Sequence, residues 1–247
     1  MTAWLQLSTV EHPEARVCCL TRAGGSARDF DAWGPALAPR VQVCAVQLPG
    51  RLNRFLEAPF TSLVDAAREL GDVLSGYQDL PLVLFGDCLG SLIAFETARH
   101  LRRAYGWVPA ALLVASYLPP DQMRTTRPYH QAPDGELRAR LAEVGGVPPE
   151  VLADDELFEL MLPTLRADFA LFETYRYVPE ALLPSDIVAM VGDSDPYVNA
   201  ASLSGWRQHT SGDFRVAEFP GGHFFLRDSP GAVELVRQTA LGASRVV

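Results

Sequence analysis

Short apolar runs of strand length recur along the chain and alternate with segments in which apolar residues repeat at helical spacing. Apolar runs bounded by turn residues are typical of buried strands, and we expect strands at 16–20, 41–46, 82–85, 110–116, 186–191 and 214–219. The helical patterns cover 62–75, 91–104 and 231–241. This alternation predicts one α/β domain over residues 1–247, with a mostly parallel sheet covered by helices on both faces.

Residues 121–178 interrupt the alternation, because they contain helical patterns and no convincing strand. The stretch DGELRARLAEVGG begins at Asp134, a candidate N-cap, and ends in two glycines. Both flanks of the segment return to strand patterns that complete one sheet. We therefore expect a helical lid at 121–178, inserted into a core formed by 1–120 and 179–247. Ordinary core helices are the alternative.

Composition narrows the class of protein. The 247 residues, 48% of them apolar, are enough to bury a sizeable core. The net charge of −9 argues against general nucleic-acid binding, and all 21 basic residues are arginine, which removes lysine-based chemistry. No apolar run reaches the length of a membrane span, and the first residues do not resemble a secretory signal. We expect a cytoplasmic protein that binds neither membrane nor nucleic acid.

Three of the four cysteines, Cys18, Cys19 and Cys44, fall in predicted strands and are expected to be buried apolar residues. No pair has a metal-finger spacing, so no metal site is expected. Cys88 differs, because FGDCLGS places it between two glycines, after a strand pattern and before an amphipathic helix pattern. That context predicts a nucleophile elbow, in which a helix N-terminus favours a thiolate.

An acid and a histidine follow Cys88 in the order that an elbow enzyme requires. GDSDPYV places Asp193 and Asp195 directly after a strand, and FPGGHFFL places His223 after the next one. Strand ends of a parallel sheet meet at one edge, so His223 is expected to act as base and a carboxylate to orient it. We favour Asp195, because Asp193 could simply cap the turn.

An oxyanion hole needs two backbone donors. The N–H of Leu89, directly after Cys88, is one candidate. The second is expected from the glycine-rich turn TRAGG at 21–25, which follows an early strand. The chain contains no GK[ST] and no GxGxxG pattern, so a nucleotide-binding loop is not expected.

Several blocks of the sequence, in the same order, resemble the type II thioesterases of polyketide and non-ribosomal peptide biosynthesis, within the α/β-hydrolase superfamily. TRAGGSARDFDAW resembles the family's PYAGGSA-x-x-F-x-x-W, and VQLPGRLNRFLEAPF resembles its VQLPGR block. FGDCLGSLIAFETARHL is similar to FGHSMGALVAFELARRL, and LRADFALFETYRYVP to a lid signature LRADF-x-x-x-E-x-Y-x-Y. The acid and histidine motifs also match, so the resemblance covers nearly the whole chain.

The resemblance implies an α/β-hydrolase fold and an enzyme that cleaves acyl groups from the phosphopantetheine arm of an acyl or peptidyl carrier protein. By position, Cys88 would be the nucleophile, His223 the base and Asp195 its orienting acid. Ala23 and Leu89 would supply the oxyanion donors. The acyl pocket would lie under the lid, with candidate walls Phe169, Phe172 and Tyr175. No cofactor is implied, since the pantetheine arm belongs to the substrate.

Three residues near this site depart from the family pattern: Cys88 replaces serine, Asp87 replaces histidine and Arg22 replaces tyrosine. A carboxylate beside a thiolate should raise the thiol pKa unless a cation offsets it. We therefore expect an Arg22–Asp87 ion pair and both side chains near the substrate.

A cysteine acyl-enzyme keeps the energy of a thioester, so acyl transfer, cyclisation or chain release is an alternative to editing hydrolysis. A non-catalytic binding protein is a third possibility. Because the chain is acidic and carrier proteins are commonly acidic, docking would need a local basic or apolar patch. Arg124 and Arg127 at the lid entrance are candidates, although each could be an ordinary surface arginine.

Overall fold

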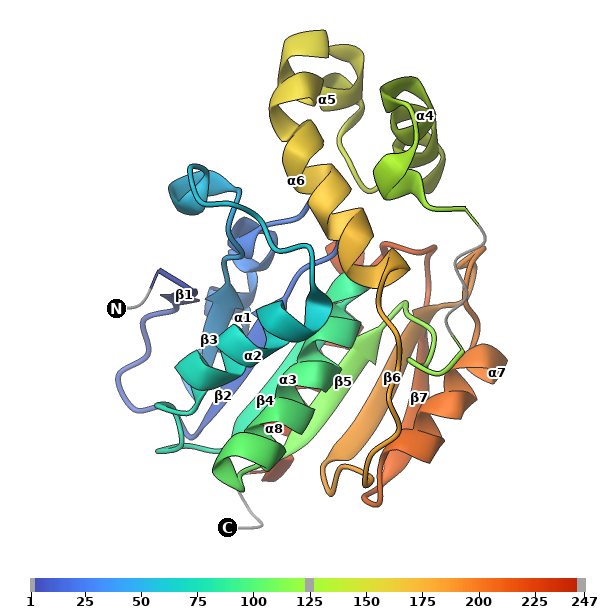
Figure 1. Cartoon of the computed structure of the whole chain (residues 1–247). Helices are drawn as coiled ribbons and strands as arrows, with labels where there is room; N and C mark the ends of the chain where they lie inside the picture. Colours follow the sequence, from blue (N-terminus) through green and yellow to red (C-terminus); the bar gives the residue numbers. More distant parts are fainter. Residues whose placement is uncertain (1–2, 123–126, 244–247) are drawn as a thin grey trace.

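The computed structural model describes residues 3–122 and 127–243, which form a seven-stranded sheet flanked by helices (Figure 1). The strand order is β1-β3-β2-β4-β5-β6-β7, and every pairing is parallel except that of β1 with β3. The strands are β1 (Leu5–Leu7), β2 (Ala15–Leu20), β3 (Val41–Val46), β4 (Leu82–Asp87), β5 (Ala111–Ala115), β6 (Asp186–Gly192) and β7 (Phe214–Phe219). This is the predicted α/β-hydrolase arrangement of a mostly parallel sheet.

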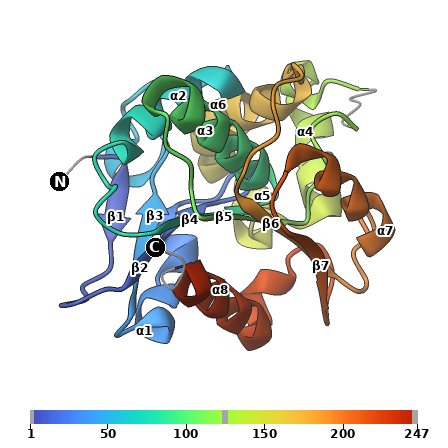
Figure 2. The same ribbon diagram turned by 90° about the horizontal axis from the view of Figure 1, so that it is seen from below.

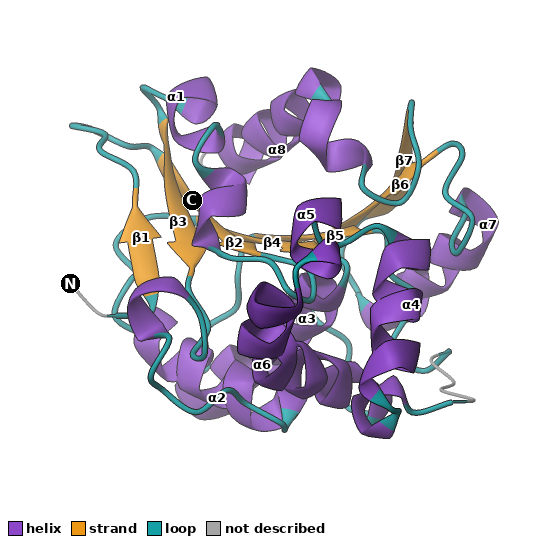
Figure 3. Ribbon diagram, turned by 90° about the horizontal axis from the view of Figure 1, so that it is seen from above, coloured by secondary structure: helices purple, strands orange, loops and turns teal. Residues whose placement is uncertain are grey.

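Helices cover both faces of the sheet, as the parallel pairing requires (Figures 2 and 3). One face carries α2 (Leu63–Leu74) and α3 (Leu89–Tyr105), and the other carries α1 (Trp33–Leu37) and α8 (Pro230–Ala243). The short α7 (Ala200–Leu203) follows β6. Each face has its own apolar core, so the central strands β2, β4 and β5 are buried on both sides.

All six predicted strands are present, and the structure adds one that the sequence pattern did not reveal. Strand β1 has only three residues, and it pairs antiparallel with β3 at the edge of the sheet. A run of this length contains too little alternation to be recognised. The predicted helices at 62–75, 91–104 and 231–241 correspond to α2, α3 and α8.

The segment between β5 and β6 contains three α-helices in its described part, residues 127–178, which we call the helical insertion. They are α4 (Asp134–Val144), α5 (Pro149–Ala153) and α6 (Asp155–Glu173), and they stand above the carboxyl edge of the sheet (Figure 1). Asp134 is the first helical residue and not the N-cap, a position that Pro133 occupies. Gly145 does end α4, in the left-handed conformation expected of a helix C-terminus.

The helical insertion has a small apolar core of its own, which includes Leu137, Phe158 and Leu165. Only its carboxyl end joins the main core, through Leu171 on α6 and Tyr175 just after it. The insertion is therefore anchored to the sheet at one end and packed on itself at the other. Among the described residues, no helix has the length and apolar character needed to cross a membrane.

Candidate active site

The turn between β4 and α3 holds Cys88 in a conformation that few side chains adopt. Its backbone has φ 50° and ψ −115°. This conformation costs free energy, and it persists only where the surrounding structure imposes it. The surroundings do so, because a Cβ at Gly86 would overlap the backbone of Gly90 and one at Gly90 would overlap that of Leu20. The two glycines thus let α3 approach the sheet closely, and the turn presents Cys88 at the helix N-terminus.

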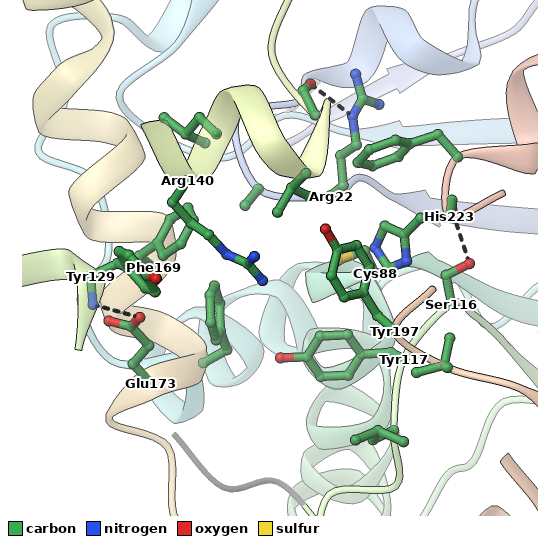
Figure 4. A pocket seen from close by; sticks show the side chains of 18 of the residues that line it. Arg22, Cys88, Ser116, Tyr117, Tyr129, Arg140, Phe169, Glu173, Tyr197 and His223 are labelled. Carbon is green, nitrogen blue, oxygen red and sulfur yellow. Dashed lines mark hydrogen bonds between the residues drawn. The ribbon is translucent and has the colours of Figure 1, made fainter. Parts of the chain in front are cut away.

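His223 lies beside Cys88, in the turn that follows β7 (Figure 4). Its Nδ1 donates a hydrogen bond to Asp195 Oδ2 at 2.9 Å, and its ring lies next to the Cys88 side chain in the same cavity. Since Nδ1 is occupied by Asp195, Nε2 is the ring nitrogen left for proton transfer. Asp193, the competing carboxylate, accepts a hydrogen bond from Gly221 N at 3.1 Å and holds the turn. The structure thus brings Cys88, His223 and Asp195 together, in the order that the sequence predicts.

The electrostatics of this group favour a charged His223. Burial alone would lower its pKa, but hydrogen bonds to Asp195 and Cys88 outweigh that effect and raise it to about 10. For Asp195, burial is likewise opposed by the hydrogen bonds from His223 and from the amides of Tyr197 and Val198, so its pKa is lowered. At neutral pH, His223 therefore holds a proton and Asp195 remains ionised.

The predicted oxyanion donors are the backbone N–H groups of Leu89 and Ala23. Leu89 opens α3, so its N–H has no acceptor within the helix. Ala23 and Cys88 line the same cavity. The loop around Ala23 is held by Gly25 N, which donates to Arg22 O at 3.0 Å, and by Gly24 N, which donates to Asp168 Oδ2 at 2.7 Å.

Asp168 forms a buried ion pair that the sequence did not reveal. Its carboxylate, on α6, accepts from Arg51 NH2 at 2.6 Å and from Arg51 NH1 at 3.0 Å. Arg51 NH1 also donates to Gly25 O at 2.9 Å. The two side chains are 9% and 1% exposed. One bidentate pair therefore ties the helical insertion, the turn after β3 and the loop that carries Ala23 to one another.

The expected ion pair between Arg22 and Asp87 does not form. Arg22 pairs with Asp29 at 2.9 Å instead, and its guanidinium lies 5.5 Å from the centre of the Phe224 ring. Asp87 is buried on β4, and its Oδ1 has no hydrogen-bond partner among the described residues. Burial raises the pKa of Asp87 to about 6, although the positive charges of Arg22, His223 and Arg227 oppose the rise.

A cavity of about 580 Å³ opens above Cys88, between the sheet edge and the helical insertion (Figure 4). Phe169 and Phe172 line it, as the sequence predicts for acyl-pocket walls, and Arg22 lies at its edge. Tyr175 requires a correction. It packs into the main core, and its hydroxyl donates to Glu96 Oε1 at 2.5 Å, so it is not a wall of this cavity. Asp87 is likewise absent from the lining.

Several residues that line the cavity above Cys88 were not predicted from the sequence. The main ones are Tyr117, Tyr129, Arg140, Glu173 and Tyr197. Tyr117 could have been predicted, because it closely follows a strand whose carboxyl end lies at the same sheet edge as Cys88. The residues from α4 and α6 could not, since a helical pattern does not say which face looks into a cavity.

Of the two arginines considered for docking, Arg124 lies outside the described residues. Arg127 lines the cavity and pairs with Glu136. Among the described residues, no group of three or more His, Cys, Asp or Glu side chains is arranged to hold a metal ion.

The model of one protein family, the thioesterase domain, matches residues 15–240, which include every residue of this site. The chain belongs to the thioesterase domain family. It is 37% identical over 207 residues to linear gramicidin dehydrogenase LgrE of Brevibacillus parabrevis, covering 83% of this chain and 79% of LgrE.

Two solved thioesterases have the same fold. The type II thioesterase BorB from the borrelidin biosynthetic cluster is 37% identical, with a TM-score of 0.86 over 96% of this chain and 97% of BorB. YbtT, a type II thioesterase from the yersiniabactin NRPS/PKS pathway, is 28% identical, with a TM-score of 0.81 over 94% of each chain.

The Arg51–Asp168 pair generates a prediction about this thioesterase-family protein. Asp168→Asn leaves Arg51 buried without a counter-charge, so we expect the free energy of unfolding to fall by about 3 kcal/mol. The loop around Ala23 should loosen at the same time, with faster amide exchange at Gly24. Urea unfolding and hydrogen exchange measure the two effects. The control is Asp155→Asn on the same helix, where the ion pair with Arg138 is exposed. Equal effects of both variants would contradict the account.

Asp87 generates a prediction about pH. Its pKa is about 6 in the folded protein and 3.8 in the unfolded chain, so the unfolded state loses the proton first as pH rises. Ionisation of Asp87 therefore destabilises the wild type progressively between pH ~4 and ~6. Asp87→Asn removes this cost, and we expect it to raise the free energy of unfolding by up to about 3 kcal/mol near pH 8. Urea unfolding across this pH range should show the difference shrinking towards pH ~4. A difference that is independent of pH would argue against a perturbed Asp87.

Proposed function

We propose that this protein is a thioesterase that releases acyl groups from the phosphopantetheine arm of an acyl or peptidyl carrier protein, through an acyl-enzyme on Cys88. The observation that supports it most is the placement of Cys88 beside His223, which bonds Asp195, at the base of a largely apolar cavity in a chain of the thioesterase family. The likeness to type II thioesterases of biosynthetic clusters favours polyketide or non-ribosomal peptide biosynthesis as the setting.

The first half of the reaction transfers the acyl group to Cys88. The sulfur, whose proton is held by His223, attacks the thioester carbonyl and forms a C–S bond. The tetrahedral oxyanion accepts hydrogen bonds from the N–H groups of Ala23 and Leu89. Collapse breaks the bond to the pantetheine sulfur, which leaves with the proton from His223. Asp195 keeps the imidazole in the tautomer and orientation that this transfer needs.

The second half returns Cys88 to its starting state. Neutral His223 takes a proton from a water molecule while the water oxygen attacks the acyl carbonyl. The same backbone donors stabilise the second oxyanion. Collapse then breaks the bond to Cys88 and gives the free acid, with His223 again protonated beside the sulfur. No cofactor takes part, because the pantetheine arm enters and leaves with the carrier protein.

The chemistry of Cys88 supports a second candidate function. Transfer from pantetheine to Cys88 exchanges one thioester for another, so the acyl-enzyme keeps the driving force that a serine ester would lose. An amine, alcohol or thiol could then take the place of water, in acyl transfer, cyclisation or chain release. The name of the relative LgrE contains the word dehydrogenase. We do not propose that activity for this chain, because it lacks the GxGxxG pattern of a dinucleotide-binding site.

Substitutions in the Cys88 group test the proposal. We expect Cys88→Ala and His223→Ala to lower kcat/KM on an acylated carrier protein by about 10³-fold or more. The control is His100→Ala, since His100 lies on α3 and bonds Asp72 away from the cavity. Full activity in Cys88→Ala or His223→Ala would refute the proposal.

Product analysis by mass spectrometry separates the two candidate functions. An added amine or thiol should be acylated by the wild type and not by Cys88→Ser if transfer occurs. If water is the sole acceptor for both enzymes, hydrolysis stands and the transfer candidate fails.

A further inference from the structure

The hydroxyl of Tyr117 is a buried polar group without a partner. Tyr117 follows β5 and lines the cavity above Cys88, where Figure 4 shows its hydroxyl pointing inward. Its Oη is hidden from solvent, and among the described residues it has no hydrogen-bond partner. A buried hydroxyl left unpaired has lost its hydrogen bonds to water and gained none in return, which is unfavourable. Such a cost at the wall of a cavity favours a ligand that can remove it.

The described neighbours of Tyr117 do not offer its hydroxyl a free acceptor. Burial raises the pKa of Tyr117 well above its usual value, and the charges of Cys88 and Glu173 raise it further. Both oxygens of Glu173 are already occupied, because they accept from Tyr129 N at 2.8 Å, His130 N at 2.9 Å and His130 Nδ1 at 2.6 Å. The hydroxyl therefore stays neutral, and among the described residues it stays unpaired.

Apolar side chains make up much of the rest of this part of the cavity. Leu118, Val144, Phe169 and Phe172 line it, and they offer hydrocarbon contacts without polar atoms. Arg140 also reaches into the cavity (Figure 4). Its guanidinium is paired with Glu143 at 2.9 Å. A fully reduced acyl chain would fill the cavity with carbon and leave Oη unpaired. A chain with an oxygen substituent could bond it.

We propose that Tyr117 is a specificity-determining residue that selects acyl chains bearing a hydroxyl or carbonyl oxygen near the thioester end over fully reduced chains. This inference rests on the proposed function, because it assumes that the cavity receives the acyl group of a thioester. The selectivity comes from one hydrogen bond. An oxygenated chain forms it with the buried Tyr117 hydroxyl, and a reduced chain leaves that hydroxyl without a partner.

The test compares two pantetheine thioesters of equal chain length, one saturated and one with a hydroxyl on the β-carbon. We expect the wild type to have the higher kcat/KM for the hydroxylated thioester. Tyr117→Phe should reduce the ratio of the two kcat/KM values by about 5- to 100-fold, the range of one buried hydrogen bond. The matched control is Tyr105→Phe, whose hydroxyl bonds Asp72 on an exposed face, and it should keep the wild-type ratio.

Two results would overturn the inference. One is a wild type that treats both thioesters alike or prefers the saturated one. The other is a Tyr117→Phe variant that slows both by the same factor, which would indicate a general packing role.

A binding measurement separates failure of this inference from failure of the proposed function. Calorimetry with Cys88→Ala, and with Tyr117→Phe added to it, gives the affinities for both thioesters without turnover. We expect tighter binding of the hydroxylated thioester to Cys88→Ala, and loss of that difference in the double variant. If the wild type hydrolyses neither thioester and the difference persists, the proposed hydrolysis fails, while the preference of Tyr117 for an oxygenated chain stands as a binding property. Equal binding of both, or binding of neither, overturns the assignment.

Discussion

The close approach of two backbone segments at the Cys88 turn is the constraint on which the rest of the site depends. Gly86 and Gly90 have no room for a Cβ, because the start of α3 lies directly against β4 and the end of β2. This contact fixes the unusual backbone of Cys88 and points its side chain at the carboxyl edge of the sheet. The turns after β6 and β7 end at the same edge, so Asp195 and His223 meet the sulfur there.

The second organising interaction is the Arg51–Asp168 ion pair, which connects the helical insertion to the sheet side of the cavity. The Arg51–Asp168 pair joins α6 to the loop that carries Ala23, and Gly24 N adds a third bond to the same carboxylate. A movement of α6 would therefore displace the loop that carries Ala23. In this protein the α6 wall of the proposed acyl cavity and the loop that carries Ala23 are held together, although they come from distant parts of the sequence.

Local patterns in the sequence were enough to predict the sheet, its flanking helices and the meeting of Cys88, Asp195 and His223. Each of these features follows from short-range periodicity or from the rule that parallel strand ends converge. Two of the failures at the site concern choices between partners. Arg22 had Asp29 as well as Asp87 within reach, and Tyr175 turned towards Glu96 in the core and away from the cavity. Such choices depend on packing across the fold, and no periodicity encodes them.

A reactive cysteine in a serine-type elbow is the central claim of this account, and it predicts a covalent intermediate. The most direct measurement is rapid quenching of the wild type with an acylated carrier protein, followed by mass spectrometry of the intact chain and its peptides. We predict one acyl mass added at Cys88, and none at Cys18, Cys19 or Cys44, which are buried. Turnover of the carrier without any acylated Cys88, during a time course that resolves single turnovers, would contradict the claim.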